Sequence, residues 1–296
     1  MKKNKGKSFL VLLASMLVML FTACEEQAPP GLDLGGTVAV DSSYMASIEV
    51  KQNKTILIEE LTGVTCPNCP NAARSIKTMS DANPGRILTV AMHPPSSGFT
   101  TPIPNKSMFD FRVATVDDII TQLGGLSGGL PSGSINREQK AAGVIFDSDW
   151  PAWVGRVNPL LTKTTPVNLH LESTYVAEDN TAELVVKVSF TETVSDNLFL
   201  TAYVIENDIE DYQDDGGDKE LYIHEHVFRQ AVTSVSGTSL NFADKTSGTV
   251  LQKRIRFNPV IEGTNAWNLD NCKVLVFVHK SGIDQSILHA AEVKLK

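Results

Sequence analysis

The pattern of apolar and polar positions changes character close to residue 164. Beyond it, apolar segments are short, rich in β-branched residues and separated by turn-rich stretches, as expected for strands. Residues 167–171 and 186–190 alternate apolar and polar side chains, which places one face of each strand against a core. This half of the chain therefore predicts an all-β, immunoglobulin-like sandwich. The expected strands are 167–171, 184–190, 198–205, 221–228, 250–257, 274–278 and 287–293.

The preceding part of the chain alternates strand and helix signals. Residues 56–61 and 86–92 are apolar runs that predict two buried strands, parallel to each other. A helix is expected between them over 66–82. The Pro-Gly pair that follows sets its end. Apolar side chains at helical spacing, beginning with Phe109, predict a second helix over 107–123. Two short helices are expected over 137–143 and 150–161.

The N-terminal segment has the three parts of an export signal. Four lysines lie among the first seven residues, and the apolar stretch 9–21 that follows is too short for a comfortable membrane span. Phe21, Thr22, Ala23 and Cys24 then resemble a bacterial lipobox, although Leu is usual where Phe21 stands. An ordinary secretory signal with a chance cysteine is the alternative. We expect a lipid on Cys24, which would hold the protein to a membrane.

The charge of the mature chain limits its partners. Removal of residues 1–23 takes away four of the 26 basic residues, which leaves 22 against 34 acidic ones and moves the formal charge from −8 to −12. Nucleic-acid binding requires a basic surface, so no nucleic-acid partner is expected. Solubility at a surface explains the excess of acidic residues without a specific partner.

A Cys-x-x-Cys pair carries the candidate chemistry. Cys66 and Cys69 stand where the apolar strand ends and the expected helix begins. The helix N-terminus stabilises a thiolate, so Cys66 would be the nucleophile, and Cys69 would close the disulfide one turn later. Glu60, six residues before Cys66, is a candidate buried proton relay, whereas Glu59 would point to the opposite face of the strand. Alternatively, both acids are solvated at a strand end.

The order of these elements resembles the thioredoxin fold. In that fold a cis-proline precedes a strand and faces the disulfide, and Pro131, after Gly129 and Leu130, matches that place. The resemblance gives Cys66, Cys69, Pro131 and Glu60 catalytic roles. There are departures: Thr65 stands where thioredoxins usually carry Trp, and residues 94–104 form an inserted loop where a substrate would approach.

These observations divide the chain into four segments. They are a lipoprotein signal peptide over 1–23, a lipidated tether over 24–50, a thioredoxin-like α/β domain over 51–163 and a β-sandwich domain over 164–296.

Other polar residues give weaker signals. His224 and His226 would lie on one strand face and could bind a metal, but no second Cys-x-x-Cys completes a zinc site, so no metal and no cofactor is expected. The acidic run 206–218 predicts a solvated hairpin. A calcium loop that began at Asp211 would need Glu at its twelfth position, where this chain has Tyr222, so the pattern fails. Cys272, the remaining cysteine, is expected to be buried and inert, with a resolving-thiol role as the alternative.

Several motifs together resemble a bacteroidete outer-membrane lipoprotein family named after a twenty-eight-kilodalton outer-membrane protein. They are the residues 58–63, the motif 66–70, Gly129-Leu130-Pro131 and the segment 222–229. The resemblance implies outer-membrane anchoring, a thioredoxin-like domain and a sandwich, with the external or periplasmic face left open. One hypothesis is thiol–disulfide exchange with envelope proteins that carry thiols or disulfides, which the sandwich would recruit. The other is a non-enzymatic, adhesin-like or assembly lipoprotein in which the disulfide is structural.

Overall fold

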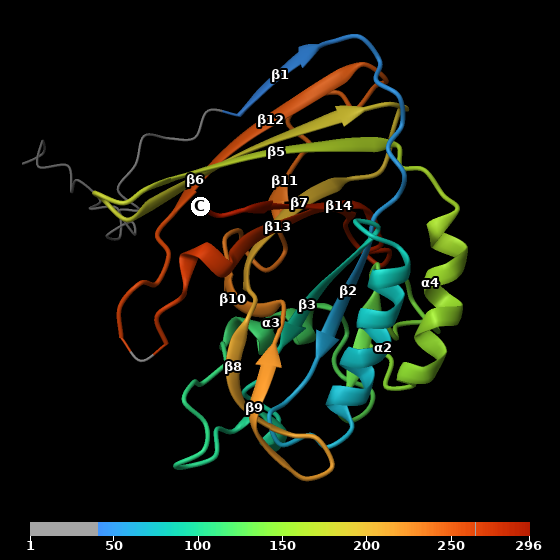
Figure 1. Ribbon diagram of the computed structural model, residues 1–296. Coiled ribbons are helices and arrows are strands. Elements are labelled where there is room, and N and C mark those ends of the chain that lie inside the picture. Colours follow the sequence, from blue (N-terminus) through green and yellow to red (C-terminus); the bar gives the residue numbers. More distant parts are fainter. Residues whose placement is uncertain (1–40, 264) are drawn as a thin grey trace, which may run out of the picture. The chain divides into compact units, whose positions relative to one another are not determined.

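Two β-sheets dominate the chain in the computed structural model, which describes residues 41–263 and 265–296 (Figure 1). The predicted signal peptide, Cys24 and the tether as far as residue 40 lie outside the described residues. The rest of the predicted tether is not all linker, because Ser42–Met45 forms strand β1 and pairs antiparallel with β12.

The smaller sheet has four strands in the order β1-β12-β6-β5. Its inner face shares one apolar core with strands β7, β13 and β14 of the larger sheet, which is the arrangement of a β-sandwich. Burial alternates along β6, as the alternation of apolar and polar residues in the sequence predicted. The strands of this half are β5 Val167–Val176, β6 Thr181–Phe190, β7 Leu198–Glu206, β11 Thr238–Ser239, β12 Thr249–Phe257, β13 Cys272–Lys280 and β14 Ile287–Lys294.

The larger sheet crosses the predicted boundary at residue 164. Its order is β14-β13-β7-β10-β3-β2-β4, with β11 also paired to β7, and β10 (Val227–Ala231) joins the two halves. Strand β10 is antiparallel to β7 and parallel to β3, where Val227 lies opposite Ala91. The segments 51–163 and 164–296 therefore share one sheet. Without β10, strand β3 would expose an edge of unpaired backbone groups.

Helices cover both faces of the strands before residue 164. Strands β2 (Ile56–Leu61) and β3 (Ile87–Met92) are parallel, and β4 (Ser132–Ile135) is antiparallel to β2. Ile56 and Ile58 pack against α2 (Cys69–Ala82) and α4 (Trp153–Leu161), whereas Leu57 and Leu61 pack in the core that contains α3 (Thr115–Gln122). Short 3₁₀ turns are η2 Gly98–Thr100, η3 Trp150–Ala152 and η4 Leu269–Asn271.

Two predicted helices differ from the structure. The helix expected over 107–123 begins only at Thr115, because the amides of Met108 and Phe109 donate to the carboxylate of Asp211 instead of helical carbonyls. No helix forms over 137–143, where Asn136 and Arg137 have positive φ angles of 50° and 52°. The η3 turn and α4 occupy the predicted segment 150–161.

The predicted strand 221–228 is divided in two. Strand β9 (Asp218–His224) ends before it, and β10 begins after His226, whose φ of 57° turns the chain. With β8 (Ile209–Asp214), β9 forms a two-stranded hairpin outside both sheets. Across the residues that the structure describes, no helix has the length and apolarity to cross a membrane.

Candidate functional site

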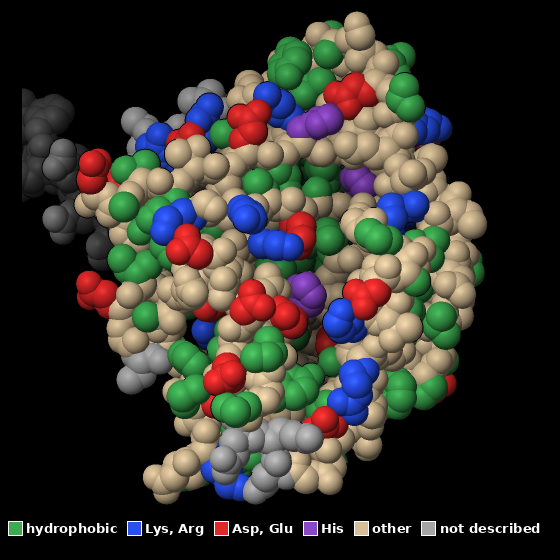
Figure 2. All heavy atoms as spheres, in the orientation of Figure 1, with side chains coloured by type: hydrophobic (Ala, Val, Ile, Leu, Met, Phe, Trp, Pro, Cys, Tyr) green, Lys and Arg blue, Asp and Glu red, His purple; other side chains and the backbone are tan. Residues whose placement is uncertain are grey.

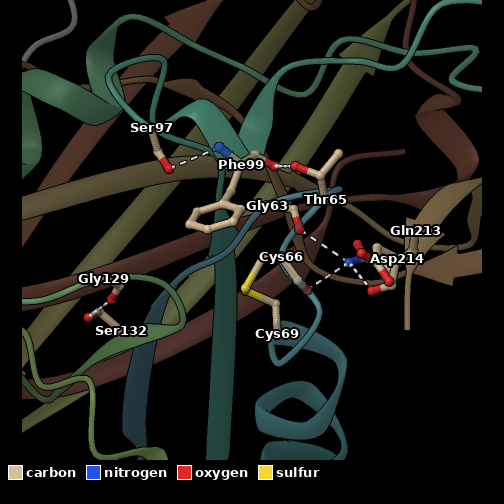
Figure 3. The surroundings of a disulfide bond; sticks show 10 residues. All are labelled: Gly63, Thr65, Cys66, Cys69, Ser97, Phe99, Gly129, Ser132, Gln213 and Asp214. Atoms are coloured by element: carbon tan, nitrogen blue, oxygen red, sulfur yellow. Dashed lines mark hydrogen bonds between the residues drawn. A yellow bond between two sulfur atoms is a disulfide. The ribbon is translucent and has the colours of Figure 1, made fainter. Parts of the chain in front are cut away.

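Cys66 and Cys69 form a disulfide at the start of helix α2 (Figure 3). The helix begins at Cys69, three residues later than predicted, so that Cys66 lies in the turn before it. Pro70 occupies the first turn, where its missing N–H is tolerated. Only 1% of each cysteine is exposed, so the disulfide is shielded from bulk solvent.

The inserted loop packs against the turn that leads into the disulfide. The ring of Phe99, in η2, lies beside the two sulfur atoms in Figure 3. The Phe99 carbonyl accepts hydrogen bonds from the Thr65 amide (2.9 Å) and hydroxyl (3.1 Å). Gly63 permits this approach, since a Cβ atom there would lie 2.6 Å from the Phe99 oxygen. Residues of the inserted loop thus pack against the turn that contains Cys66, and a substrate's approach at this loop stays a prediction.

The β8–β9 hairpin holds the same turn from the other side. The Gln213 side-chain amide donates to the carbonyl oxygens of Gly63 (3.1 Å) and Cys66 (3.4 Å), and the Asp214 amide donates to the Val64 carbonyl (2.8 Å). Gln213 is itself buried, so these bonds help to satisfy the donor groups of its side-chain amide. Nothing in the sequence pattern connects residue 213 to the cysteine pair.

Pro131 lies at the end of β2 that leads to the disulfide. The Leu130–Pro131 peptide bond is cis, and the next residue, Ser132, pairs with Leu61. The Ser132 hydroxyl donates to the Gly129 carbonyl at 2.8 Å, which closes the loop around the proline (Figure 3).

The two neighbouring glutamates of β2 face opposite sides of the sheet. Glu59 accepts two hydrogen bonds from the buried guanidinium of Arg137, at 2.6 and 2.9 Å. Glu60 is 3% exposed, and no hydrogen-bond partner among the described residues reaches its Oε1 atom. Burial raises the pKa of Glu60 to about 8, so the carboxyl is protonated at neutral pH. Neither acid is solvated.

A cavity of about 520 Å³ lies behind the disulfide. It is bounded by α2, by the ends of β2 and β3 and by the β8–β9 hairpin, and Cys69 and Glu60 are among its lining residues. His93 also lines it and is 1% exposed; the sequence analysis missed this residue. Its position directly after a buried parallel strand is the signal that could have found it, because such strand ends carry binding residues.

The other predicted polar sites are differently arranged. His224 and His226 do not share a strand face, because β9 ends at His224 and the chain turns at His226. The described residues hold no group of three or more His, Cys, Asp or Glu side chains arranged for a metal. The acidic hairpin is not fully solvated, since Asp211 is buried and anchors residues 108 and 109.

Cys272 is a free, buried cysteine on β13. Burial raises the pKa of its thiol to about 12, so the thiolate needed for exchange does not form near neutral pH. This environment agrees with the expectation of an inert core residue.

Comparisons with known proteins place the chain by sequence and by fold. A family model described as outer membrane protein Omp28 matches residues 124–296. The curated proteins include no match. HBP35 of Porphyromonas gingivalis is similar in structure, with a TM-score of 0.64 and 21% identity over 82% of this chain and 76% of that chain. At this identity the likeness concerns the fold alone.

Two further solved structures are similar at a lower level. A protein of Agrobacterium tumefaciens has a TM-score of 0.49 and 13% identity, over 83% of this chain and 97% of that chain. A domain of the outer membrane lipoprotein Omp28 from Porphyromonas gingivalis has a TM-score of 0.30 and 14% identity, over 45% of this chain and 89% of that chain.

Proposed function

The chain belongs to the Omp28 family of outer-membrane proteins, and from this premise we propose that it is an envelope module for thiol–disulfide exchange. The protein is an outer-membrane lipoprotein, as the family resemblance implied. Cys24 is the residue proposed to carry the lipid.

One observation carries the proposal: a disulfide at the N-terminus of α2 and a cis Leu130–Pro131 peptide both lie at the same end of β2. The strand, Cys-x-x-Cys, helix, parallel strand, helix and cis-proline order supports a thioredoxin-like region over 51–163. The fold similarity to HBP35 is compatible with this assignment. The β-sandwich would present the partner protein.

The proposed exchange conserves electrons between two cysteine pairs. With both cysteines reduced, the Cys66 thiolate attacks a partner disulfide. This attack forms a mixed disulfide between Cys66 and the partner and releases one partner thiolate. The Cys69 thiolate then attacks the Cys66 sulfur, which closes the Cys66–Cys69 bond and releases the second partner thiol. The partner gains two electrons, and the module loses two. The reverse sequence oxidises a partner dithiol.

Neighbouring residues have proposed roles in these steps. Glu60, protonated near neutral pH, would exchange a proton with Cys69, which lines the same cavity. Pro131 leaves its neighbouring backbone free to pair with an extended partner segment, because it has no N–H. Since only 1% of Cys66 is exposed, the surrounding segments must move for a partner to reach its sulfur, and the Phe99 ring is the proposed barrier.

The test is the reduction potential of the Cys66–Cys69 pair in the mature protein. The protein is equilibrated in glutathione or dithiothreitol buffers, and free thiols are counted by alkylation. Exchange chemistry predicts a potential between about −120 and −270 mV, the range of working oxidoreductases. A Cys66→Ser variant should then lose disulfide transfer to a reduced protein substrate, whereas Cys272→Ser, which removes the buried thiol, should retain it.

A structural disulfide is the second candidate, and the 1% exposure of both cysteines favours it. In that role the bond fixes the turn that η2 and the β8–β9 hairpin grip. A potential below about −300 mV, typical of structural disulfides, would support this candidate and contradict the exchange proposal. Cys66→Ser would then lower the melting temperature without changing any transfer rate.

A further inference from the structure

The cavity behind the disulfide has the size of a small-molecule site. Its volume of about 520 Å³ lies within the range of ligand pockets, which is roughly 300–1,000 Å³. Figure 2 shows the corresponding face of the molecule hollowed beside a histidine side chain, with acidic and basic side chains around the opening. The cavity lies between α2 and the hairpin, whereas Phe99, which lies beside the disulfide, is not among its lining residues.

Three buried side chains that line the cavity, here called the floor groups, each have at least one polar atom without a partner among the described residues. Glu60 Oε1 and both ring nitrogens of His93 are buried, and no hydrogen bond to them is made by the described residues. The buried Nδ1 atom of His226, nearer the turn, is in the same condition. Buried polar atoms without partners are costly, and in native structures each needs an explanation. All three side chains line this cavity.

These floor groups are uncharged at neutral pH. Burial raises the pKa of Glu60 to about 8 and lowers the pKa of His93 to about 3. A protonated carboxyl and a neutral imidazole each offer one donor and one or more acceptor positions. They complement a neutral hydrogen-bonding group, whereas an ion would bring an unpaired charge to a buried surface.

The basic residues at the rim are already neutralised by carboxylates. Arg74 binds Asp215 through two hydrogen bonds, of 2.9 and 3.0 Å, and Lys77 binds Asp81 at 2.8 Å. Lys273, at the opposite margin, is paired with Glu292. A ligand would therefore compete with existing ion pairs if it were anionic.

One wall of the cavity is apolar. Ala73 and Ile76 of α2 line it, and Ala91 and Val227 contribute at the junction of β3 and β10. An apolar wall with a few convergent polar groups is the usual composition of a small-molecule site.

We propose that this cavity binds an uncharged small molecule that places a donor–acceptor group, such as a carboxamide, against Glu60 and His93 and an apolar body against α2. The inference goes beyond the exchange function and does not depend on it, because binding requires neither sulfur atom to react.

Three probes of equal shape and different charge test the proposal: benzamide, benzoate and benzamidinium. Each is titrated into the oxidised, mature protein at pH 7, and binding is followed by the NMR shifts of the histidine rings. Benzamide should shift the His93 and His226 resonances saturably, with a Kd at least tenfold below those of the two ions. Absence of a saturable benzamide shift, or equal binding of either ion, would overturn the proposal, and this comparison needs no variant.

A pair of variants on α2 localises the binding. Ala73→Phe should fill the cavity and abolish the benzamide shift, whereas Ala82→Phe, on the same helix but outside the cavity, should leave the Kd unchanged. If Ala73→Phe, shown to be folded by its spectrum, binds benzamide as the parent protein does, the site lies elsewhere and the proposal is wrong. The reduction potential is measured separately, so failure of either proposal is distinguishable from failure of the other.

Discussion

The side-chain amide of Gln213 donates a hydrogen bond to the backbone carbonyl of Cys66, and the same nitrogen also reaches Gly63 and Asp214. A residue in the second half of the chain thus fixes the turn that contains the first cysteine. The hairpin controls how freely that turn can move.

Replacing Gln213 by Ala should loosen this turn. Three carbonyl oxygens would lose a donor, and a buried site of this kind costs about 1–3 kcal/mol when its partner is removed. We expect a lower melting temperature and a severalfold faster reduction of the disulfide by dithiothreitol. Gln252→Ala, in β12 of the smaller sheet, is the control and should leave the reduction rate unchanged. Equal rates in Gln213→Ala and the parent protein would mean that the hairpin does not restrain the turn.

Replacing Phe99 by Ala should expose the disulfide without loosening the hairpin. The backbone bonds from Thr65 to residue 99 persist, because they use the Phe99 carbonyl and not its ring. Phe99 is itself 45% exposed, so the loss of stability should stay small, under about 1 kcal/mol. Stopped-flow reduction by a small thiol should become at least threefold faster. Tyr44→Ala, an exposed aromatic on β1, provides the matched control, and an unchanged rate in Phe99→Ala would show that the ring does not block access.

The buried pair of Glu59 and Arg137 should be important for folding. Arg137→Leu would leave the Glu59 carboxylate buried without its partner, and breaking such a pair costs about 3–5 kcal/mol. Urea unfolding followed by fluorescence measures this loss. The exposed pair of Lys77 and Asp81 is the control, and Lys77→Ala should cost less than about 1 kcal/mol. A similar small loss in Arg137→Leu would contradict the prediction.

Glu60 should make the protein less stable as the pH rises from about 4.5 to about 8. The pKa of this carboxyl is raised to about 8 in the folded protein, so over that range the folded state holds a proton that the unfolded state has released. The free energy of unfolding then falls with rising pH, by about 1.4 kcal/mol per pH unit at most, and levels off above pH 8.

The Glu60→Gln variant isolates this contribution. Histidines such as His93, with a pKa lowered to about 3, act in the opposite direction and destabilise the fold as the pH falls below about 6.5. The quantity to measure is therefore the difference in unfolding free energy between the parent protein and Glu60→Gln, at pH 5, 6, 7 and 8. It should shift in favour of the variant as the pH rises. A constant difference would mean that Glu60 titrates normally, and Glu172→Gln on the exposed side of β5 gives the baseline.

Local sequence patterns predicted most strands because each strand's burial alternates or is continuous along its own residues. Six strands each include the apolar run that predicted them, namely β5, β6, β7, β12, β13 and β14. Segment 107–114 could not be predicted, since its conformation depends on Asp211, about a hundred residues away in sequence. The pairing of β10 with β3 could not be predicted for the same reason, because the two strands lie far apart in the sequence.

The candidate site was partly predictable for the same reason. The cysteine pair, the cis peptide before Pro131 and the opposite faces of Glu59 and Glu60 follow from neighbouring residues. The hydrogen bonds of Gln213 and the cavity could not be predicted, because both depend on the packing of the β8–β9 hairpin beside the distant segment 63–82. The sharing of one sheet across the predicted boundary at residue 164 could not be predicted either, because it depends on the pairing of β10 with the distant strand β3.

The parallel pairing of Ala91 in β3 with Val227 in β10 also joins two segments that lie far apart in the chain, so the larger sheet has a high contact order. A chain synthesised from its N-terminus contains the cysteine pair and strand β3 before β10 is present. Until then β3 has an open edge, and the hairpin that carries Gln213 has not arrived to shield the cysteines. We therefore expect both thiols to be accessible in the incomplete chain and to become buried only when the later strand completes the sheet.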